Sequence, residues 1–238
     1  MVLKLYGSPV SGSTKRVAMV LDEKHVSYEF HIVDLQKGAQ KAPEHVAKQP
    51  FGQVPYIVWQ TFTCALPPSQ ADLPFCFCAQ DDDGFILYES RAIARYIATK
   101  YASQGTPLIP LGNLRALALF EQAAAVEQAH FEGPAQGIRF EHVAKKMIGL
   151  KTDEARVTEL KNTLASKLDV YEGILSKQKY VAGDELTLAD LFHLPCGVTV
   201  KQFAPELFAS RPHVAKWFES IENRQSWQAI KDVIPSST

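Results

Sequence analysis

The stretch "QPFGQVPYIV", Gln49 to Val58, joins a polar loop, a Val-Pro pair and an apolar run typical of a strand. A proline at the first residue of a strand gives up a backbone donor. The residues before it therefore carry peptide groups that the adjoining sheet does not use. The stretch predicts a strand entrance and raises the question of what those groups bind.

Patterns on both sides of this stretch indicate a small α/β domain. Alternating or β-branched runs predict strands over 2–7, 28–35, 55–59 and 84–89, and helical spacing predicts helices over 13–24 and 90–101. The resulting order is βαβ followed by ββα. That order is typical of a parallel β-α-β unit extended by an antiparallel hairpin and a helix.

The segment 60–83 does not fit a hairpin turn, which usually takes about 2–5 residues. It is apolar, contains three cysteines and has two adjacent prolines. It could be a functional lid, an ordered surface loop or a translated intron. We favour a surface loop, because a long loop costs little additional closure entropy.

The second half of the chain is helical by pattern. Gly and Pro punctuation over 102–110 predicts a linker, and helices are expected over 113–131, 153–178, 187–200 and 212–230. The sequence therefore predicts a domain over 1–101 with an insertion at 60–83, and an all-helical domain over 111–238. The apolar stripe expected on the helix 153–178 consists of Val157, Leu160, Leu164, Leu168, Val170 and Leu175.

One helix start carries a capping box. Thr187 stands at the N-cap and Asp190 at the third helical position of "LTLADL". We interpret the pair as the nucleus of a core helix with no role in chemistry.

Composition and cysteine spacing exclude several classes of protein. The 238 residues carry a formal net charge of -1, which argues against nucleic acid as the main partner. No apolar run approaches the ~20 residues of a membrane span, and the N-terminus does not read as a signal peptide, so we expect a cytoplasmic protein. Metal sites are not expected, and free thiols are expected at Cys64, Cys76, Cys78 and Cys196.

Four motifs in order give a resemblance to a known family. The βαβ-ββα domain contains "PFGQVP" and "ESRAIARYIA", and the helical domain contains "LTLADL" and "RPHVAKWFESI". Together they resemble cytosolic glutathione S-transferases, and the start "GSPVSGSTKRV" is most similar to the phi class of plants and fungi. The resemblance implies a thioredoxin-like α/β domain with a mixed four-stranded sheet, followed by an all-α bundle.

The family implies an enzyme that conjugates the glutathione thiolate to electrophilic, mostly apolar xenobiotics, in detoxification and stress response, with peroxidase activity as a further expectation. Glutathione is the co-substrate, no permanently bound cofactor is expected, and family members are homodimers. A non-catalytic carrier or a transferase-like interaction domain is the alternative. Ser11 stands at the position of the family's catalytic serine, which favours an enzyme over these alternatives.

The resemblance also answers the opening question. Val54-Pro55 resembles the family's cis-proline, which would turn the Val54 peptide groups outward to pair with the cysteinyl part of glutathione. Glu89 and Ser90 stand at a helix N-terminus, which suits the γ-glutamyl carboxylate.

Three further residues are expected at the ends of the tripeptide. Gln53 would bind its γ-glutamyl part, and Lys41 its glycyl carboxylate. Gln40 stands where the phi pattern has histidine, and a solvated surface position is its alternative role, as it is for Lys41.

The chemistry is expected in "PVSGSTKR". A hydroxyl that donates to sulfur near a helix N-terminus stabilises the thiolate and lowers its pKa. Ser11 matches the catalytic serine of the family. Ser13 and Thr14 are further hydroxyls and candidate helix caps, and either could be the donor instead or could support the loop.

The electrophile is expected in an apolar pocket between the domains. Its candidate residues, each of which also suits ordinary helix packing, are Val10, Gly12, His130, Phe131 and Pro134.

Overall fold

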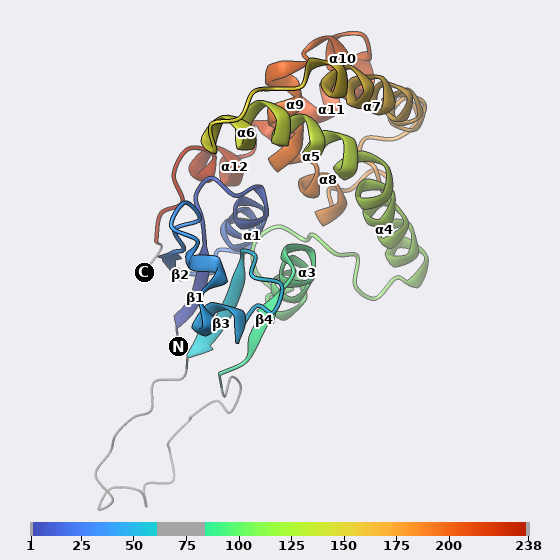
Figure 1. Ribbon diagram of the computed structural model, residues 1–238. Coiled ribbons are helices and arrows are strands. Elements are labelled where there is room, and N and C mark those ends of the chain that lie inside the picture. Colours follow the sequence, from blue (N-terminus) through green and yellow to red (C-terminus); the bar gives the residue numbers. More distant parts are fainter. Residues whose placement is uncertain (1, 61–83, 237–238) are drawn as a thin grey trace, which may run out of the picture.

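The computed structural model describes residues 2–60 and 84–236. They form a four-stranded sheet with flanking helices and a larger group of helices that lies above it in Figure 1. The strands are β1 (Val2–Gly7), β2 (Tyr28–Ile32), β3 (Tyr56–Gln60) and β4 (Ile86–Tyr88). The helices beside the sheet are α1 (Gly12–Glu23), the short η1 (Ala39–Lys41), α2 (Pro43–Val46) and α3 (Ser90–Lys100).

The remaining helices follow the 102–110 segment. They are α4 (Leu114–Val126), η3 (Glu127–Glu132), α5 (Gly133–Arg139), η4 (Phe140–Ala144), α6 (Lys145–Met147), α7 (Glu154–Leu175), α8 (Leu188–Phe192), α9 (Leu194–Phe203), α10 (Glu206–Ala209), α11 (Pro212–Glu222) and α12 (Gln225–Ile230).

The sheet has the order β2-β1-β3-β4. β1 pairs parallel with β2 and antiparallel with β3, and β3 pairs antiparallel with β4. The mixed α/β fold expected from the βαβ-ββα pattern is therefore confirmed. The second strand is shorter than predicted, because β2 ends at Ile32.

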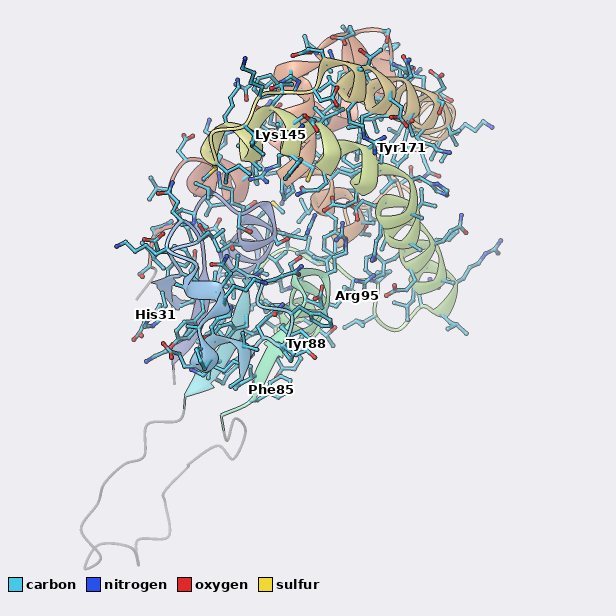
Figure 2. All side chains as sticks on the ribbon, in the orientation of Figure 1. His31, Phe85, Tyr88, Arg95, Lys145 and Tyr171 are labelled. Carbon is cyan, nitrogen blue, oxygen red and sulfur yellow. The ribbon has the colours of Figure 1, made fainter. Side chains whose placement is uncertain are left out.

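One row of residues crosses all four strands. His31, Tyr6, Tyr56 and Tyr88 lie opposite one another in register, with His31 and Tyr88 on the two outer strands (Figure 2). β1 ends one residue after this row, β4 ends at it and β3 begins at it. The loops that follow β1, precede β3 and follow β4 therefore leave the sheet at one end, which we call the loop end.

The two faces of the sheet are covered differently. On one face, α1 and α3 pack together, and their buried residues join Leu5 and Ile57 in the core. On the other face, the Tyr6 and Tyr56 rings stack at 4.6 Å, and the Lys48 ammonium lies over both. The sheet is thus fixed on both sides, and its loop end is held in place.

A continuous helical run extends from α4 through α6, beyond the predicted end at residue 131. π-Helical turns at η3 and η4 carry the chain past Gly133 and Pro134. Such turns are rare and occur often near functional sites. Here they bring the second half of the run over the loop that follows β1 (Figure 1).

The stripe of α7 is confirmed except at one position. Val170 is 61% exposed, so its predicted core role is wrong, and Tyr171 is buried instead. The reason is helical period: Tyr171 lies three residues after Leu168 and four before Leu175, on the same face.

The predicted capping box is confirmed at the start of α8, where the Thr187 N–H donates to Asp190 Oδ2 at 2.9 Å. The helix predicted over 187–200 is split into α8 and α9, and the one over 212–230 into α11 and α12.

Several expectations fall on residues that are not described. The insertion, apart from Gln60, and its three cysteines lie outside the described residues.

Cys196 is a free, buried cysteine. Among the described helices, none is both long and apolar enough to cross a membrane. The domain limits proposed above stay a prediction.

Candidate functional site

Three chain segments meet at the loop end of the sheet. They are the β1–α1 loop with Ser11, the segment before β3 with Val54, and the junction of β4 and α3 with Ser90. The Arg16 side chain of α1 donates to Ser90 Oγ at 2.9 Å and so joins the first segment to the third.

Ser11 is the N-cap of α1. Its backbone is extended and its Oγ accepts a hydrogen bond from the Thr14 N–H at 3.3 Å. The expected capping role of Ser13 and Thr14 is therefore wrong, since Ser13 lies within the first turn. Thr14 is buried, and its Oγ1 accepts from the Ser8 N–H at 3.2 Å, which fixes the loop.

Val54 presents open peptide groups. The Val54-Pro55 bond is cis. Within residues 2–60 and 84–236, neither the N–H nor the C=O of Val54 has a hydrogen-bond partner. The preceding Gln53 is held firmly: its N–H donates to Gln49 Oε1 at 3.1 Å, and its C=O is bonded to His45 Nε2 at 2.7 Å. The open donor and acceptor are therefore fixed in direction.

Lys41 lies close to Gly52. Gly52 has φ 59°, and a Cβ there would stand 2.8 Å from the Lys41 Cδ and Nζ atoms, so only glycine fits without displacement. The Lys41 ammonium donates to the Phe51 carbonyl at 3.2 Å. Beside it, Gln40 Oε1 is buried without a partner among the described residues.

Glu89 and Ser90 begin α3. Glu89 has φ 70° and ψ 107°, an unfavourable conformation for a non-glycine residue and of a kind that is common at ligand sites. Its side chain is exposed, whereas Ser90 is buried. The first N–H groups of α3 have no acceptor within their own helix and lie at its positive end.

A buried charge cluster lies beneath Ser90. The Arg16 guanidinium also contacts the Glu132 carboxylate at 3.3 Å, and Arg91 forms two hydrogen bonds with buried Glu127. Burial opposes the ionisation of Glu132, but Arg16 and Arg91 outweigh it and hold the pKa of Glu132 below its usual value. Sequence reasoning missed this cluster, although Arg16 stands at a position where the helical period of α1 requires burial.

An open hollow of about 250 Å³ lies beside Ser11. Val10 and Ser11 form one wall and the helical run α5–α6 the other, and we call it the electrophile hollow. Val10 was predicted here. The lining residues that the sequence did not indicate are Leu35, Gln36, Arg139, Val143, Ala144, Met147 and Ile148.

The other predicted pocket residues lie elsewhere. Gly12 lines a neighbouring hollow with Pro9 and Lys15. Phe131 is 1% exposed and packs in the core with its ring 4.6 Å from that of His193, so it does not line the electrophile hollow. His130 is exposed, and neither it nor Pro134 lines either hollow.

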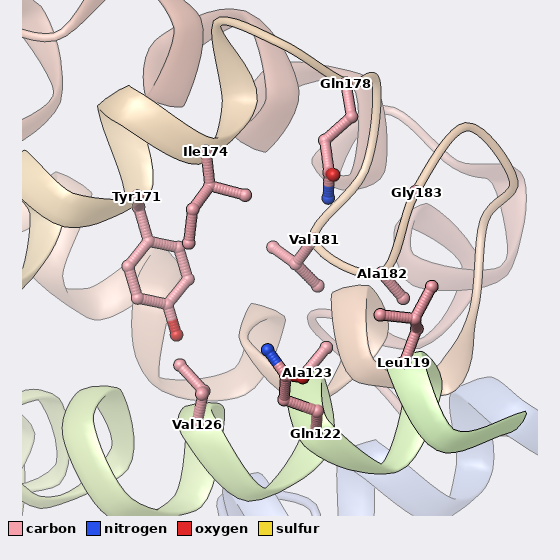
Figure 3. A pocket seen from close by; sticks show the side chains of 10 residues that line it. All are labelled: Leu119, Gln122, Ala123, Val126, Tyr171, Ile174, Gln178, Val181, Ala182 and Gly183. Carbon is pink, nitrogen blue, oxygen red and sulfur yellow. The ribbon is translucent and has the colours of Figure 1, made fainter. Parts of the chain in front are cut away.

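A further hollow of about 240 Å³ lies within the helical half, between α4, α7 and the segment 178–183 (Figure 3). Tyr171 extends from α7 toward α4 in this view, and its hydroxyl is bonded to His193 Nε2 at 3.0 Å. The hollow shares no residue with the electrophile hollow. Among the described residues there is also no group of His, Cys, Asp and Glu side chains that could hold a metal ion.

Comparison with known proteins extends over the whole chain. The family "Glutathione S-transferase, N-terminal domain" matches residues 5–105, and "Glutathione S-transferase, C-terminal domain" matches residues 124–225. "Glutathione S-transferase PM239X14" of Arabidopsis thaliana is 41% identical over 235 residues, which cover 98% of this chain and 93% of the relative.

Solved structures agree with these matches. Glutathione transferase F7 from Populus trichocarpa is similar with a TM-score of 0.85 and 33% identity, over 98% of this chain and 100% of that one. Glutathione S-transferase I from maize, in complex with an atrazine glutathione conjugate, has a TM-score of 0.81 and 31% identity, over 100% of both chains.

Proposed function

Because this chain belongs to the glutathione S-transferase family, and within it to the phi class, we propose that the loop end of the sheet binds glutathione and that Ser11 stabilises its thiolate. The chain is a transferase enzyme. The observation that carries the proposal is the open peptide pair of Val54, which lies at the same end of the sheet as Ser11 and Ser90.

The cysteinyl residue of glutathione pairs with Val54. A peptide bound in extended form needs one acceptor and one donor from the protein, as in the addition of a strand to a sheet. The C=O and N–H of Val54 supply both. Because Gln53 and Pro55 are fixed on either side, these groups lose little freedom on binding.

The γ-glutamyl end lies at the start of α3. The Ser90 hydroxyl and the helix N-terminus receive its α-carboxylate. Arg16 already donates to Ser90 Oγ, so the Ser90 hydrogen remains free to donate to the ligand. The exposed carboxylate of Glu89 binds the α-ammonium group, and Gln53 adds side-chain bonds.

The glycyl carboxylate lies near Lys41. The ammonium of Lys41 has three donors, of which the Phe51 carbonyl uses one. Gln40 supports this end by donating its side-chain amide N–H to the carboxylate.

Ser11 acts on the sulfur. Its Oγ accepts from the Thr14 N–H, which leaves its own hydrogen to donate to the thiolate. The N-terminus of α1 adds a positive dipole at the same place. Both favour the charged form and lower the pKa of the bound thiol. Ser13 is the alternative donor.

The electrophile lies in the electrophile hollow, next to Ser11. With an aryl halide, the thiolate forms a bond to the ring carbon, and the carbon–halogen bond breaks as halide leaves. With an organic hydroperoxide, the thiolate sulfur forms a bond to the terminal oxygen, the O–O bond breaks, and the alkoxide leaves and is protonated to the alcohol. A second glutathione thiol then attacks the resulting glutathione sulfenic acid, which gives the disulfide and water. The structure of glutathione S-transferase I from maize contains an atrazine glutathione conjugate, which supports an aromatic electrophile for this chain.

A homodimer is part of the proposal. Phe51 and Leu114 are large apolar side chains that are 64% and 83% exposed in the single chain. A subunit interface would remove such side chains from water, which is favourable. Sedimentation equilibrium tests this directly, and a monomer at micromolar concentration would contradict it.

The test of function is turnover of 1-chloro-2,4-dinitrobenzene with glutathione by the purified chain and by Ser11→Ala. The variant should lose about tenfold or more in turnover at neutral pH, the value of one hydrogen bond to a charged group, and regain part of it at higher pH. Binding of glutathione without turnover by the unmodified chain would contradict the proposal and support a carrier.

A further inference from the structure

Arg139 is the one charged residue among the described residues that line the electrophile hollow. It stands at the end of α5, and its Nη2 donates to the Val10 carbonyl, next to Ser11. Within residues 2–60 and 84–236, its side chain makes no further hydrogen bond and no ion pair. A guanidinium has five N–H donors, so most of them remain available on this wall.

The rest of the wall is uncharged. Its apolar part consists of Val10, Leu35, Val143, Ala144, Met147 and Ile148. A guanidinium in partly apolar surroundings attracts negative charge more strongly than in water, because such surroundings screen it less. No carboxylate among the described lining residues competes for it. The charge that Arg139 can stabilise in the hollow is therefore one that the electrophile carries or forms.

The position of Arg139 decides which reaction can use it. In the proposed function Ser11 holds the glutathione sulfur, and the guanidinium is bonded to the peptide group that joins Val10 to Ser11. The guanidinium and the attacked carbon are thus neighbours. When a thiolate displaces a halide from a saturated carbon, the negative charge leaves with the halide. When it adds to a conjugated aldehyde or ketone, the charge forms on the carbonyl oxygen, which remains part of the bound molecule.

We propose that Arg139 is a catalytic residue for conjugate addition to α,β-unsaturated aldehydes and ketones with an apolar body, which rests on the proposed binding of glutathione at Ser11. The thiolate sulfur forms a bond to the β-carbon, the C=C π electrons move between the α-carbon and the carbonyl carbon, and the C=O π electrons move onto oxygen. Arg139 donates to that oxygen. The proton that the thiol lost on ionisation returns from solvent to the α-carbon, so the reaction is an addition with no leaving group.

This arrangement stabilises the enolate more than the neutral carbonyl group. A hydrogen bond from a guanidinium to a charged oxygen is stronger than one to a neutral oxygen. Donors that are fixed before the reaction need no reorganisation when the charge forms, and the bond to the Val10 carbonyl holds Arg139 in this way. Arg139 therefore contributes mainly to the rate of the addition and little to the binding of the free electrophile.

The first test compares trans-4-phenyl-3-buten-2-one with benzyl chloride at saturating glutathione. In Arg139→Gln, the ratio of kcat/KM for the enone to kcat/KM for benzyl chloride should fall about tenfold or more, because only the enone places charge on an oxygen. Arg139→Lys keeps a cation and should recover part of the ratio. Arg156→Gln is the matched control, because Arg156 is an exposed helix arginine that lines none of the hollows described.

An unchanged ratio in Arg139→Gln would overturn the proposal. If both rates fall by the same factor, Arg139 only holds the β1–α1 loop, and if neither falls, it does not act on the reaction. Benzyl chloride separates this failure from that of the proposed function. Its conjugation by the original chain with an unchanged ratio removes the role of Arg139 alone, whereas no turnover of either electrophile removes both.

The second test measures binding without turnover. S-(2-carboxyethyl)glutathione places a charged oxygen where the enolate oxygen forms, and its neutral amide, S-(2-carbamoylethyl)glutathione, stands for the carbonyl compound. The ratio of their affinities, measured by calorimetry, should shift about tenfold toward the amide in Arg139→Gln and stay constant in Arg156→Gln. The same ratio in the original chain and in Arg139→Gln would overturn the proposal.

Discussion

Asp190 and Val54 differ in whether the protein itself satisfies their hydrogen bonds. The Asp190 carboxylate, buried in the helical half, accepts hydrogen bonds from the N–H groups of Val181 and Thr187 and from the Trp217 indole, each at 2.9 Å. The peptide groups of Val54, at the loop end of the sheet, have no partner among the described residues.

The difference shows how each place is used. A buried polar group that is fully bonded stabilises the fold, because removal of one partner leaves the others unsatisfied. A fixed donor and acceptor that the chain itself does not use are available to a ligand. Changes at Asp190 should therefore alter stability with little effect on glutathione, and changes at the loop end should do the reverse.

The largest expected effect is on stability. Asp190→Ala should lower the free energy of unfolding by about 3 kcal/mol or more, because several buried donors lose their acceptor at once. This exceeds the cost of a lost helix cap, about 0.5–2 kcal/mol. Urea denaturation measures it, with exposed Asp184→Ala as the control. A small loss of stability in Asp190→Ala, or an altered KM for glutathione in the folded variant, would contradict the assignment of Asp190 to the fold alone.

A second structural carboxylate gives a pH test. Burial raises the pKa of Glu23, but hydrogen bonds from Arg224, Ser226 and Thr106 outweigh it and hold that pKa below its usual value. A lowered pKa in the folded state stabilises the protein above about pH 4.5, and this contribution is lost as the pH falls through the folded value.

Glu23→Gln should therefore cost about 1.5–3 kcal/mol at pH 7, the range for a hydrogen bond to a charged group, and less at pH 4. Thermal melts across this range measure the difference, with exposed Glu219→Gln as the control. A cost that is the same at both pH values would show that the Glu23 charge is not what joins α1 to α12.

At the loop end, the two carboxylates of glutathione should be separable. Ser90→Ala should weaken glutathione binding about tenfold through the γ-glutamyl end, and Lys41→Ala by a similar factor through the glycyl end. Calorimetry with γ-glutamylcysteine, which lacks the glycyl carboxylate, is the control. If this analogue loses as much affinity as glutathione does in Lys41→Ala, the assignment of Lys41 is wrong.

Local sequence patterns predicted those parts of the site whose geometry depends on the backbone alone. The strand 2–7, the proline before β3 and the start of α3 follow from local patterns, and they place Ser11, Val54 and Ser90 at one end of the sheet. The electrophile hollow could not be predicted in the same way. Its wall comes from Arg139 and Val143, beyond a Gly-Pro pair where a regular helix would end.

The charge cluster was hidden for a related reason. Arg16 and Glu132 are 116 residues apart in the sequence, and only the packing of α1 against the helical half brings them together. Local patterns carry no signal for such pairs. The sequence signal for the cluster is Arg16 itself, a charged residue at a position that the helical period assigns to the core.

The most direct measurement of the central claim is the titration of enzyme-bound glutathione by the ultraviolet absorbance of its thiolate, in the original chain, Ser11→Ala and Ser13→Ala. We predict a thiol pKa below that of free glutathione in the original chain and in Ser13→Ala. In Ser11→Ala we predict a rise of about one unit, which corresponds to about 1.4 kcal/mol of lost preference for the thiolate. An unshifted titration in Ser11→Ala, with a raised pKa in Ser13→Ala, would contradict the assignment and move the donor two residues along α1.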